Sequence, residues 1–176
     1  MTPSPLRRAA LALALAATFS PALAQSTTAA ATPGWPSKPV KLVVGFPGGS
    51  SPDLVARTLA EPLAKALGQP VIVENKVGAG GNIAADAVAK ATDDHTLGIM
   101  INGNLTIARL INPRINYDPL KDLTPISLIA TAPLALAAPA NAPGATAQEF
   151  FAAARASGDR WNYGTPGVGT VAHIGM

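Results

Sequence analysis

The stretch LVVGFPGGSSPDLVAR, Leu42–Arg57, decides the fold class of this chain of 176 residues. An apolar, β-branched run is followed by a turn rich in glycine and serine, and then by the start of an amphipathic helix. Ser51 is expected to be the helix N-cap, Pro52 suits the first helical position, and Asp53 complements the positive end of the helix dipole. The free amides of such a turn can bind an anion, although an ordinary strand-to-helix turn explains the same residues.

The order of strand, loop and helix recurs along the chain as far as residue 101. Val40–Gly45 is expected to be a buried strand, and the helix after it ends at Gly68. Val71–Asn75 and Thr96–Ile101 are the next strands expected, with a second helix between them. The apolar stripes of the two helices are expected to consist of Val55, Leu59, Pro62, Leu63 and Ala66, and of Ile83, Ala87, Val88 and Ala91. This alternation predicts right-handed βαβ units and a parallel sheet, and therefore an α/β fold.

The pattern changes after Asn112, where prolines divide the chain into short extended runs. Ile126–Ala130 and Leu134–Ala138 are two such runs, and we interpret them as a crossover between two lobes. Thr146–Glu149 has the spacing of a capping box, so a helix is expected from there to Gly158. Trp161–Tyr163 is then expected to be a strand that enters another glycine-rich turn before a last helix.

The first residues of the chain have the pattern of a secretory signal peptide, residues 1–24. Arg7 and Arg8 precede an alanine-rich apolar run, which ends in the small-x-small site Ala22–Ala24. Residues 25–36 are expected to be a disordered leader. Without the signal peptide, 11 of the 13 basic residues remain against 10 acidic residues, and nothing supports nucleic-acid binding. Cysteine is absent, which excludes disulfides and thiolate metal sites.

Four glycine-rich or asparagine-containing loops follow the expected strands. Ligands of open α/β sheets bind at that end of the strands, so the loops favour an oxyanion held mainly by backbone amides and hydroxyl groups. Glycine and asparagine also tolerate turn geometry without any ligand, and that interpretation stays open for each single residue. The side chains that would supply hydrogen bonds are Ser50, Ser51, Asn82, Asn102, Asn104 and Thr170.

The motifs of common enzyme classes are incomplete in this chain. Gly78–Ile83 begins like a dinucleotide-binding fingerprint, but Ile83 stands where a third small residue is needed, and there is no GxxxxGK[ST] or GxSxG motif. His95 follows two aspartates in a turn and is expected to be solvated, whereas His173 is either exposed or faces a ligand. Asp53 can act as a general base, but helix capping explains it without further assumptions. We therefore expect no enzyme activity, metal or cofactor.

Short motifs follow one another in a fixed order from Trp35 to the end of the chain. They are Trp35–Val40, Val44–Gly49, Asp53–Arg57, Glu74–Lys76, Gly78–Ile83, Tyr117–Pro119, Asp122–Ile126, Asn162–Gly164 and Gly169–His173. In this order the chain resembles the substrate-binding proteins of tripartite tricarboxylate transporters, the Bug or TctC-like family. The resemblance implies a periplasmic-binding-protein-like fold of type II, with two α/β lobes joined by a hinge. Residues 37–132 would form a first lobe with its crossover, and residues 133–176 the beginning of a second, truncated lobe.

The family resemblance also implies a function. Such a protein captures a small carboxylate in the periplasm, for example a dicarboxylate, tricarboxylate, amino acid or aromatic acid, and passes it to membrane permease subunits. It would act as a monomer, without catalysis or cofactor. The ligand-binding residues implied are Phe46, Pro47, Gly48, Gly49, Ser50, Ser51 and Asp53 in the first loop, Gly78, Ala79, Gly80, Gly81 and Asn82 in the second, Asn102, Gly103 and Asn104 in the third, and Gly164, Thr165, Gly167, Gly169, Thr170 and His173 in the fourth.

The chain departs from the family pattern in places. Gly48 replaces a frequent proline or alanine, Pro52 stands where a small hydroxyl residue is common, and residues 102–109 differ from the commoner versions. About half of such a protein is covered. The alternatives that remain are a sensing or scaffolding module for a membrane sensor protein, a fragment without function, and an exported hydrolase with Ser50 or Ser51 as nucleophile.

Overall fold

The structure is a computed structural model that describes residues 34–176. The expected signal peptide, residues 1–24, lies outside the described residues, as does most of the expected leader, residues 25–36. The chain divides into two compact units, Met1–Trp35 and Pro36–Met176. All the features described below belong to the second unit.

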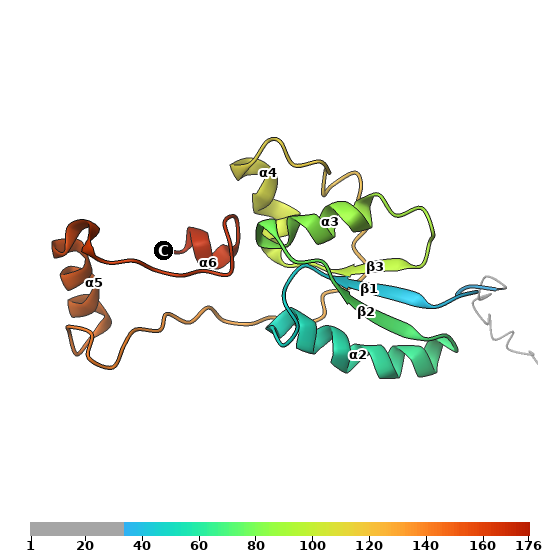
Figure 1. Cartoon of the computed structure of the whole chain (residues 1–176), viewed down its shortest axis with the longest axis horizontal. Helices are drawn as coiled ribbons and strands as arrows, with labels where there is room; N and C mark the ends of the chain where they lie inside the picture. Colours follow the sequence, from blue (N-terminus) through green and yellow to red (C-terminus); the bar gives the residue numbers. More distant parts are fainter. Residues whose placement is uncertain (1–33) are drawn as a thin grey trace, which may run out of the picture. The chain divides into compact units, whose positions relative to one another are not determined.

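Three parallel strands form a sheet in the order β2-β1-β3 (Figure 1). Their bounds are Val40–Val44 for β1, Val71–Asn75 for β2 and Thr96–Ile99 for β3. The central strand β1 places Val43 opposite Glu74 of β2 and Gly98 of β3. The valine and leucine side chains of the central strand are buried on both faces of the sheet, because a helix covers each face. The predicted parallel sheet is confirmed, although β3 ends two residues earlier than expected.

Two helices cover opposite faces of this sheet (Figure 1). Helix α2 spans Ser51–Leu67 and contacts β1 and β2, whereas α3 spans Asn82–Ala89 and contacts β1 and β3. The hydrophobic core on the α2 side consists of Leu42, Val44, Phe46, Ala56 and Ile99. Each helix therefore follows its own strand and returns over the sheet, as in a βαβ unit.

Both apolar stripes agree only in part with the prediction, because five of their predicted members are half-buried, namely Val55, Leu59, Leu63, Ala87 and Val88. On α2, Ala56 is fully buried whereas Pro62 and Ala66 are exposed. On α3, the alanines at 84 and 85 are buried, whereas Ile83 is 51% exposed. Small side chains let a helix approach the sheet closely, so alanine rather than the larger apolar residues occupies the contact.

The two ends of α2 differ in how well the sequence predicted them. Ser50, not Ser51, is the N-cap, with φ −71° and ψ 159°, and its hydroxyl donates to the carbonyl of Pro47 instead of capping an amide. Gly68 ends the helix in the left-handed conformation at φ 68°, as predicted. On the exposed side of the helix, Lys65 forms an ion pair with Glu61, with 2.7 Å between Nζ and Oε1.

The segment after β3 is helical rather than an open polar turn. A π-helical turn, η3, spans Gly103–Ile107 and continues into α4, Ala108–Ile111. Asn102 has helical backbone angles, and its carbonyl accepts a hydrogen bond from the Thr106 hydroxyl. The expectation of a simple turn at 102–104 is therefore wrong, because the chain begins a helix there. The second glycine-rich loop likewise contains a short 3₁₀ turn, η2, at Ala79–Gly81.

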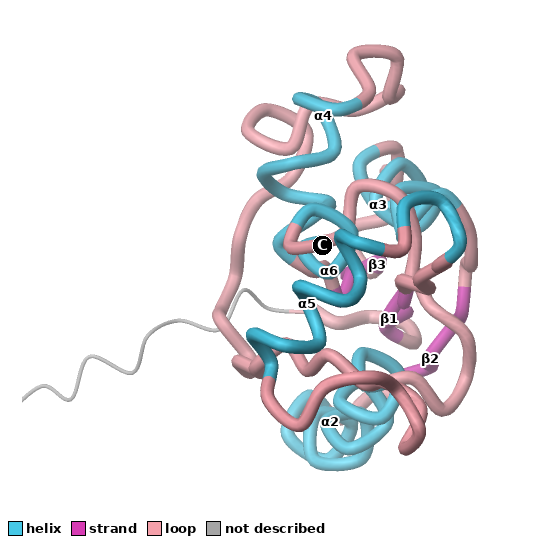
Figure 2. Tube along the Cα trace, turned by 90° about the vertical axis from the view of Figure 1, so that its left-hand side faces the viewer, coloured by secondary structure: helices cyan, strands magenta, loops and turns pink. Residues whose placement is uncertain are grey.

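The remaining elements are α5 at Ala147–Ala156, η4 at Gly158–Arg160 and α6 at Val171–Ile174. The predicted capping box is confirmed, because Thr146 and Glu149 each bond the other's backbone N–H at 3.3 Å. The segment between α4 and α5 is a loop without regular structure (Figure 2).

The strand expected at 161–163 does not form. A strand requires a paired neighbour, and within residues 34–176 the only strands are β1, β2 and β3, which pair with one another. The ring of Trp161 instead lies 5.3 Å from that of Phe150 on α5. Among the same residues, no helix has the length and apolar content needed to cross a membrane.

Candidate functional site

Glycine-rich loops contact one another at the carboxyl ends of the strands. The loop after β1 meets the loop after β2 so closely that a Cβ on Gly45 would lie 2.6 Å from the Cα of Gly81. The loop after β3 meets the last loop in the same way, because a Cβ on Gly103 would lie 2.6 Å from the carbonyl oxygen of Gly169. Larger residues at these contacts would force the loops apart. The structure thus brings together all four loops that the sequence singled out.

A small pocket of about 130 Å³ lies between the second loop, the last loop and helix α4. Its lining residues are Ala79, Asn82, Ala108, Ile111, Asn112, Val168 and Gly169. The polar side chains of this lining are the carboxamides of Asn82 and Asn112, and neither a lysine nor an arginine lines the pocket. A ligand in this pocket would therefore meet amide groups and an apolar wall, rather than a charged partner.

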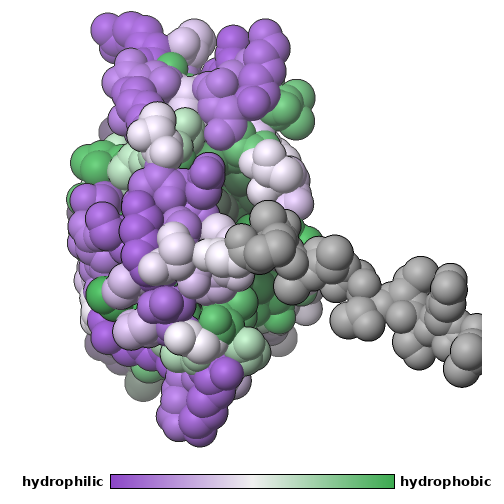
Figure 3. Space-filling model, turned by 90° about the vertical axis from the view of Figure 1, so that its right-hand side faces the viewer, coloured by the Kyte–Doolittle hydropathy of each residue, from purple (hydrophilic) through white to green (hydrophobic). Residues whose placement is uncertain are grey.

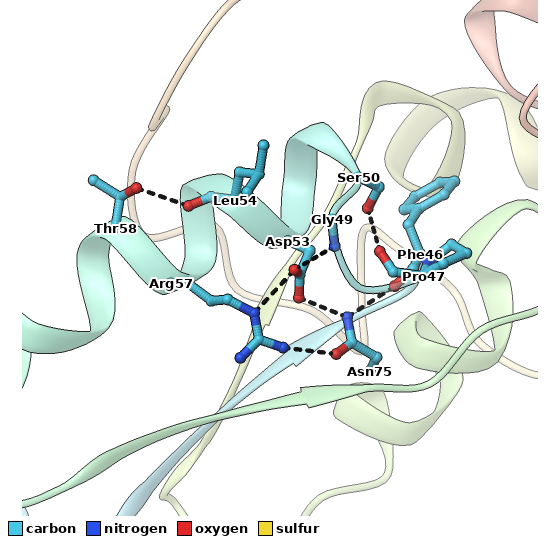
Figure 4. Close-up of polar contacts among 9 residues, drawn as sticks. All are labelled: Phe46, Pro47, Gly49, Ser50, Asp53, Leu54, Arg57, Thr58 and Asn75. Carbon is cyan, nitrogen blue, oxygen red and sulfur yellow. Dashed lines mark hydrogen bonds and ion pairs between the residues drawn. The ribbon is translucent and has the colours of Figure 1, made fainter.

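Asp53 belongs to a closed cluster beside the first loop (Figure 4). Its carboxylate accepts from Arg57 Nε at 2.9 Å, from the Gly49 amide at 2.8 Å and from Asn75 Nδ2 at 2.8 Å. The side chain is only 1% exposed. The Arg57 hydrogen bond, with those of Gly49 and Asn75, holds the pKa of the Asp53 carboxyl well below its usual range.

The contacts in this cluster give Asp53 a structural role. Both carboxylate oxygens are engaged by groups of the chain itself, and a carboxylate of low pKa is a weak base. The bond to Gly49 fixes the turn of the first loop, and Asn75 also donates to the carbonyl of Phe46 at 2.9 Å. Arg57 and Asn75, which were not among the candidate residues, thus hold this loop in place.

The other groups of the first loop are also largely engaged. The side chain of Phe46 is buried in the core, and Pro47 O accepts from both the amide and the hydroxyl of Ser50. Ser51 is exposed at the start of α2. The amide of Gly48, by contrast, has no hydrogen-bond acceptor among residues 34–176. It is therefore a backbone donor that the first loop can offer to a ligand.

The second and third loops are joined by a buried polar network. Asn104 is 2% exposed, and its Nδ2 donates to Gly80 O at 2.9 Å and to Asn82 Oδ1 at 2.8 Å. The Tyr117 hydroxyl lies 2.9 Å from both Asn82 Oδ1 and the Asn104 carbonyl oxygen. Tyr117 was not a candidate residue, and only its place in the motif Tyr117–Pro119 could have drawn attention to it.

The last loop is fixed by the cap of α6. Thr170 is buried, its hydroxyl donates to Gly167 O at 2.7 Å, and it accepts from the amide of His173 at 3.3 Å. The Nδ1 atom of His173 accepts from the Gly169 amide at 3.4 Å, and the side chain is half-buried. Gly164 and Thr165 do not line the pocket, so the predicted fourth loop contributes mainly through its second half.

His95 is buried, so the expectation that it is solvated is wrong. Its Nε2 accepts from the Ser37 amide at 3.0 Å, and its Nδ1 lies 2.7 Å from Asp93 O. The carbonyl oxygen can only accept, so Nδ1 carries the proton. His95 directly precedes β3 and therefore lies at the end of the sheet where the strands begin. Polar residues cover much of the face at this end, with apolar residues between them (Figure 3).

Comparisons with known proteins point to one family. Residues 55–176 match the family described as tripartite tricarboxylate transporter family receptor. A protein in the gbd 5′ region of Cupriavidus necator is 40% identical over 92% of this chain and 49% of its own length. BugT of Bordetella pertussis is 43% identical over 58% of this chain and 32% of its own length. The chain spans about half the length of the curated relatives that match most of it.

Two solved structures share the fold. An R. palustris protein with adipate has a TM-score of 0.72 and 34% identity, over 77% of this chain and 46% of that protein. MatC from Rhodopseudomonas palustris with bound malate has a TM-score of 0.51 and 43% identity, over 54% of this chain and 33% of MatC. The predicted α/β fold of the periplasmic-binding-protein kind is confirmed, and the described residues form part of it.

Proposed function

This chain belongs to the family of tripartite tricarboxylate transporter receptors, and on that premise we propose that it binds a small carboxylate in the pocket among its glycine-rich loops. The observation that carries the proposal is a pocket between the second loop, the last loop and helix α4 that is lined by two carboxamides and no charged side chain, within a group of four loops in mutual contact. Amide groups can hold a carboxylate without the desolvation cost of a buried cation. The related structures solved with adipate and with malate support this class of ligand.

The apolar wall of the pocket indicates which kind of carboxylate the pocket would accept. Ala108, Ile111 and Val168 contribute aliphatic surface next to the carboxamides of Asn82 and Asn112. A short aliphatic dicarboxylate has two polar ends joined by a methylene chain, so one carboxylate can meet the carboxamides while the chain lies against the aliphatic surface.

Family membership supports a role in the periplasm, where the receptor would deliver its ligand to membrane permease subunits. The signal-peptide pattern of residues 1–24 agrees with export. Binding and release of a carboxylate require no catalytic nucleophile or base. In agreement with this, the hydroxyl of Ser50 donates to a backbone carbonyl and Asp53 is held as an ion-paired carboxylate.

A panel of ligands tests the proposal. We expect the melting temperature of the chain to rise with at least one of adipate, malate, citrate, aspartate and benzoate, because a ligand that binds only the folded state stabilises it. At a concentration of 100 times Kd, the stabilisation is about 2.7 kcal/mol. The corresponding neutral amides serve as controls. An unchanged melting temperature with every carboxylate, or an equal rise with the amides, would contradict the proposed function.

A further inference from the structure

We propose that Tyr117 is a positioning residue of the pocket: together with Asn104, it orients the carboxamide of Asn82 so that Asn82 Nδ2 donates to the bound carboxylate. This inference rests on the proposed function and identifies a donor and the side chains that aim it. Tyr117 follows α4 in the chain, 35 residues beyond Asn82. Its role is therefore visible only in the folded structure.

The acceptor side of the Asn82 carboxamide is occupied. Its Oδ1 receives Asn104 Nδ2 at 2.8 Å and faces the Tyr117 hydroxyl at 2.9 Å. A carbonyl oxygen has two lone pairs, so these two donors satisfy it. Rotating the carboxamide by half a turn would place its NH₂ group against the NH₂ group of Asn104, which is itself fixed because Asn104 Nδ2 donates to Gly80 O and Asn104 Oδ1 accepts from the Ile101 amide. The network therefore permits one orientation of the Asn82 side chain.

The donor side of the same group is free. Among residues 34–176, Asn82 Nδ2 has no hydrogen-bond acceptor, although Asn82 is partly buried and lines the pocket. A partly buried NH₂ group without an acceptor favours a ligand that supplies one. A carboxylate oxygen accepts such a bond, whereas a cationic group would be repelled by the two N–H dipoles.

The environment of Tyr117 keeps it able to donate. Its side chain is buried, and burial together with the nearby charge of Asp86 raises the pKa of Tyr117 to about 12. The hydroxyl is thus protonated throughout the physiological range. Its single proton is shared between Asn82 Oδ1 and the Asn104 carbonyl, which links the second and third loops at one atom.

Two substitutions separate orientation from packing. Tyr117→Phe keeps the ring but removes the hydroxyl, and Asn82→Asp keeps an oxygen for both donors while replacing the free NH₂ with a negative oxygen. Asn112→Asp is the matched control, because it adds the same charge to the same pocket without touching the network. The probe is adipate, or the acid that stabilises the unaltered chain most in the panel, titrated by calorimetry.

We expect Tyr117→Phe to weaken binding of the acid about tenfold, as the loss of one positioned hydrogen bond implies. Asn82→Asp should weaken it at least a hundredfold, and clearly more than Asn112→Asp, while its melting temperature stays near that of the unaltered chain. The side-chain NH₂ signals of Asn82 should shift on ligand addition in the unaltered chain. The shift should shrink in Tyr117→Phe, a readout that a purely structural role would not change.

The outcomes distinguish this inference from the function on which it rests. If the unaltered chain binds none of the acids, the proposed function fails and the inference falls with it. If the unaltered chain binds, but Tyr117→Phe binds equally well or Asn82→Asp weakens binding no more than Asn112→Asp, the inference is overturned. The proposed function then stands.

Discussion

Residues 40–117 and residues 118–176 obey the same local sequence rules but reach different degrees of burial. The first region buries the apolar side chains of its central strand and places Tyr117 at 4% exposure. In the second, Leu120, Ile126 and Leu128 are 89%, 79% and 80% exposed, although they are as apolar as the core residues. Apolar character therefore does not determine burial by itself. An extended segment can be buried only if a neighbouring strand also completes its backbone hydrogen bonds, since unpaired backbone groups are costly to bury.

The largest expected effect tests this contrast in burial. Leu42→Ala removes a core side chain and should lower the free energy of unfolding by about 2–5 kcal/mol. Leu128→Ala removes the same atoms from an exposed position and should change it by less than about 0.5 kcal/mol. Urea unfolding followed by circular dichroism measures both. Equal losses in the two variants would show that the second region has a core of its own.

Next in size is the contact between the first two loops. Gly45→Ala places a methyl group against the backbone of Gly81 and should destabilise the chain by about 1–3 kcal/mol through overpacking. Gly164→Ala is the control, because a Cβ there meets no atom within 4 Å. The same unfolding experiment compares the two variants. A Gly45→Ala chain as stable as the control would mean that the loops do not pack against each other in solution.

The Asp53 cluster should appear as a dependence of stability on pH. The folded-state pKa of Asp53 is depressed, so its contribution is complete above the unfolded value of about 4 and is lost as pH falls below it. We expect Asp53→Asn to reduce the decline in stability between about pH 5 and pH 3. Glu61→Gln, which removes an exposed carboxylate of the same helix, should keep the decline. Urea midpoints at several pH values test this, and parallel profiles for Asp53→Asn and the unaltered chain would contradict it.

The smallest effect concerns the second region, where a helix forms from local signals. Thr146→Ala removes the capping box of α5 and should cost about 1 kcal/mol of helix stability. Amide hydrogen exchange within 147–156 should accelerate, whereas Thr131→Ala, in the unstructured segment, should leave it unchanged. Unaltered exchange in Thr146→Ala would show that α5 is stabilised mainly by packing.

Features that depend on neighbouring residues in the sequence were predictable, and features that depend on distant residues were not. The capping box at Thr146 and the left-handed Gly68 follow from local backbone chemistry, and both formed as predicted. The strand expected at 161–163 failed because its partner is not a local property. The helix stripes were predicted only in part, since the sheet selects the small alanines rather than the largest apolar residues.

In the candidate site, too, the features set by neighbouring residues were predictable and those set by distant residues were not. Glycine and asparagine after each strand indicated where the loops lie, and the structure brings these loops together. Asn75 and Tyr117 could not be recognised, because their partners are 22 and 35 residues away and are reached only through the fold. Arg57, by contrast, lies four residues after Asp53 on the same helix, a spacing that could have indicated the pair. The same contacts explain why Asp53, a candidate for binding or base chemistry, is engaged within the chain.

The central claim is that a carboxylate binds in the pocket between the second loop, the last loop and helix α4. Its most direct test is a titration of the ¹⁵N-labelled chain with the acid that stabilises it most, followed by amide chemical shifts. We predict that the largest shifts occur in 78–82, in 108–112 and in 167–170, with little change at Leu128 or in α5. Saturable shifts confined to other residues, or the absence of any shift at these loops on binding, would contradict the claim.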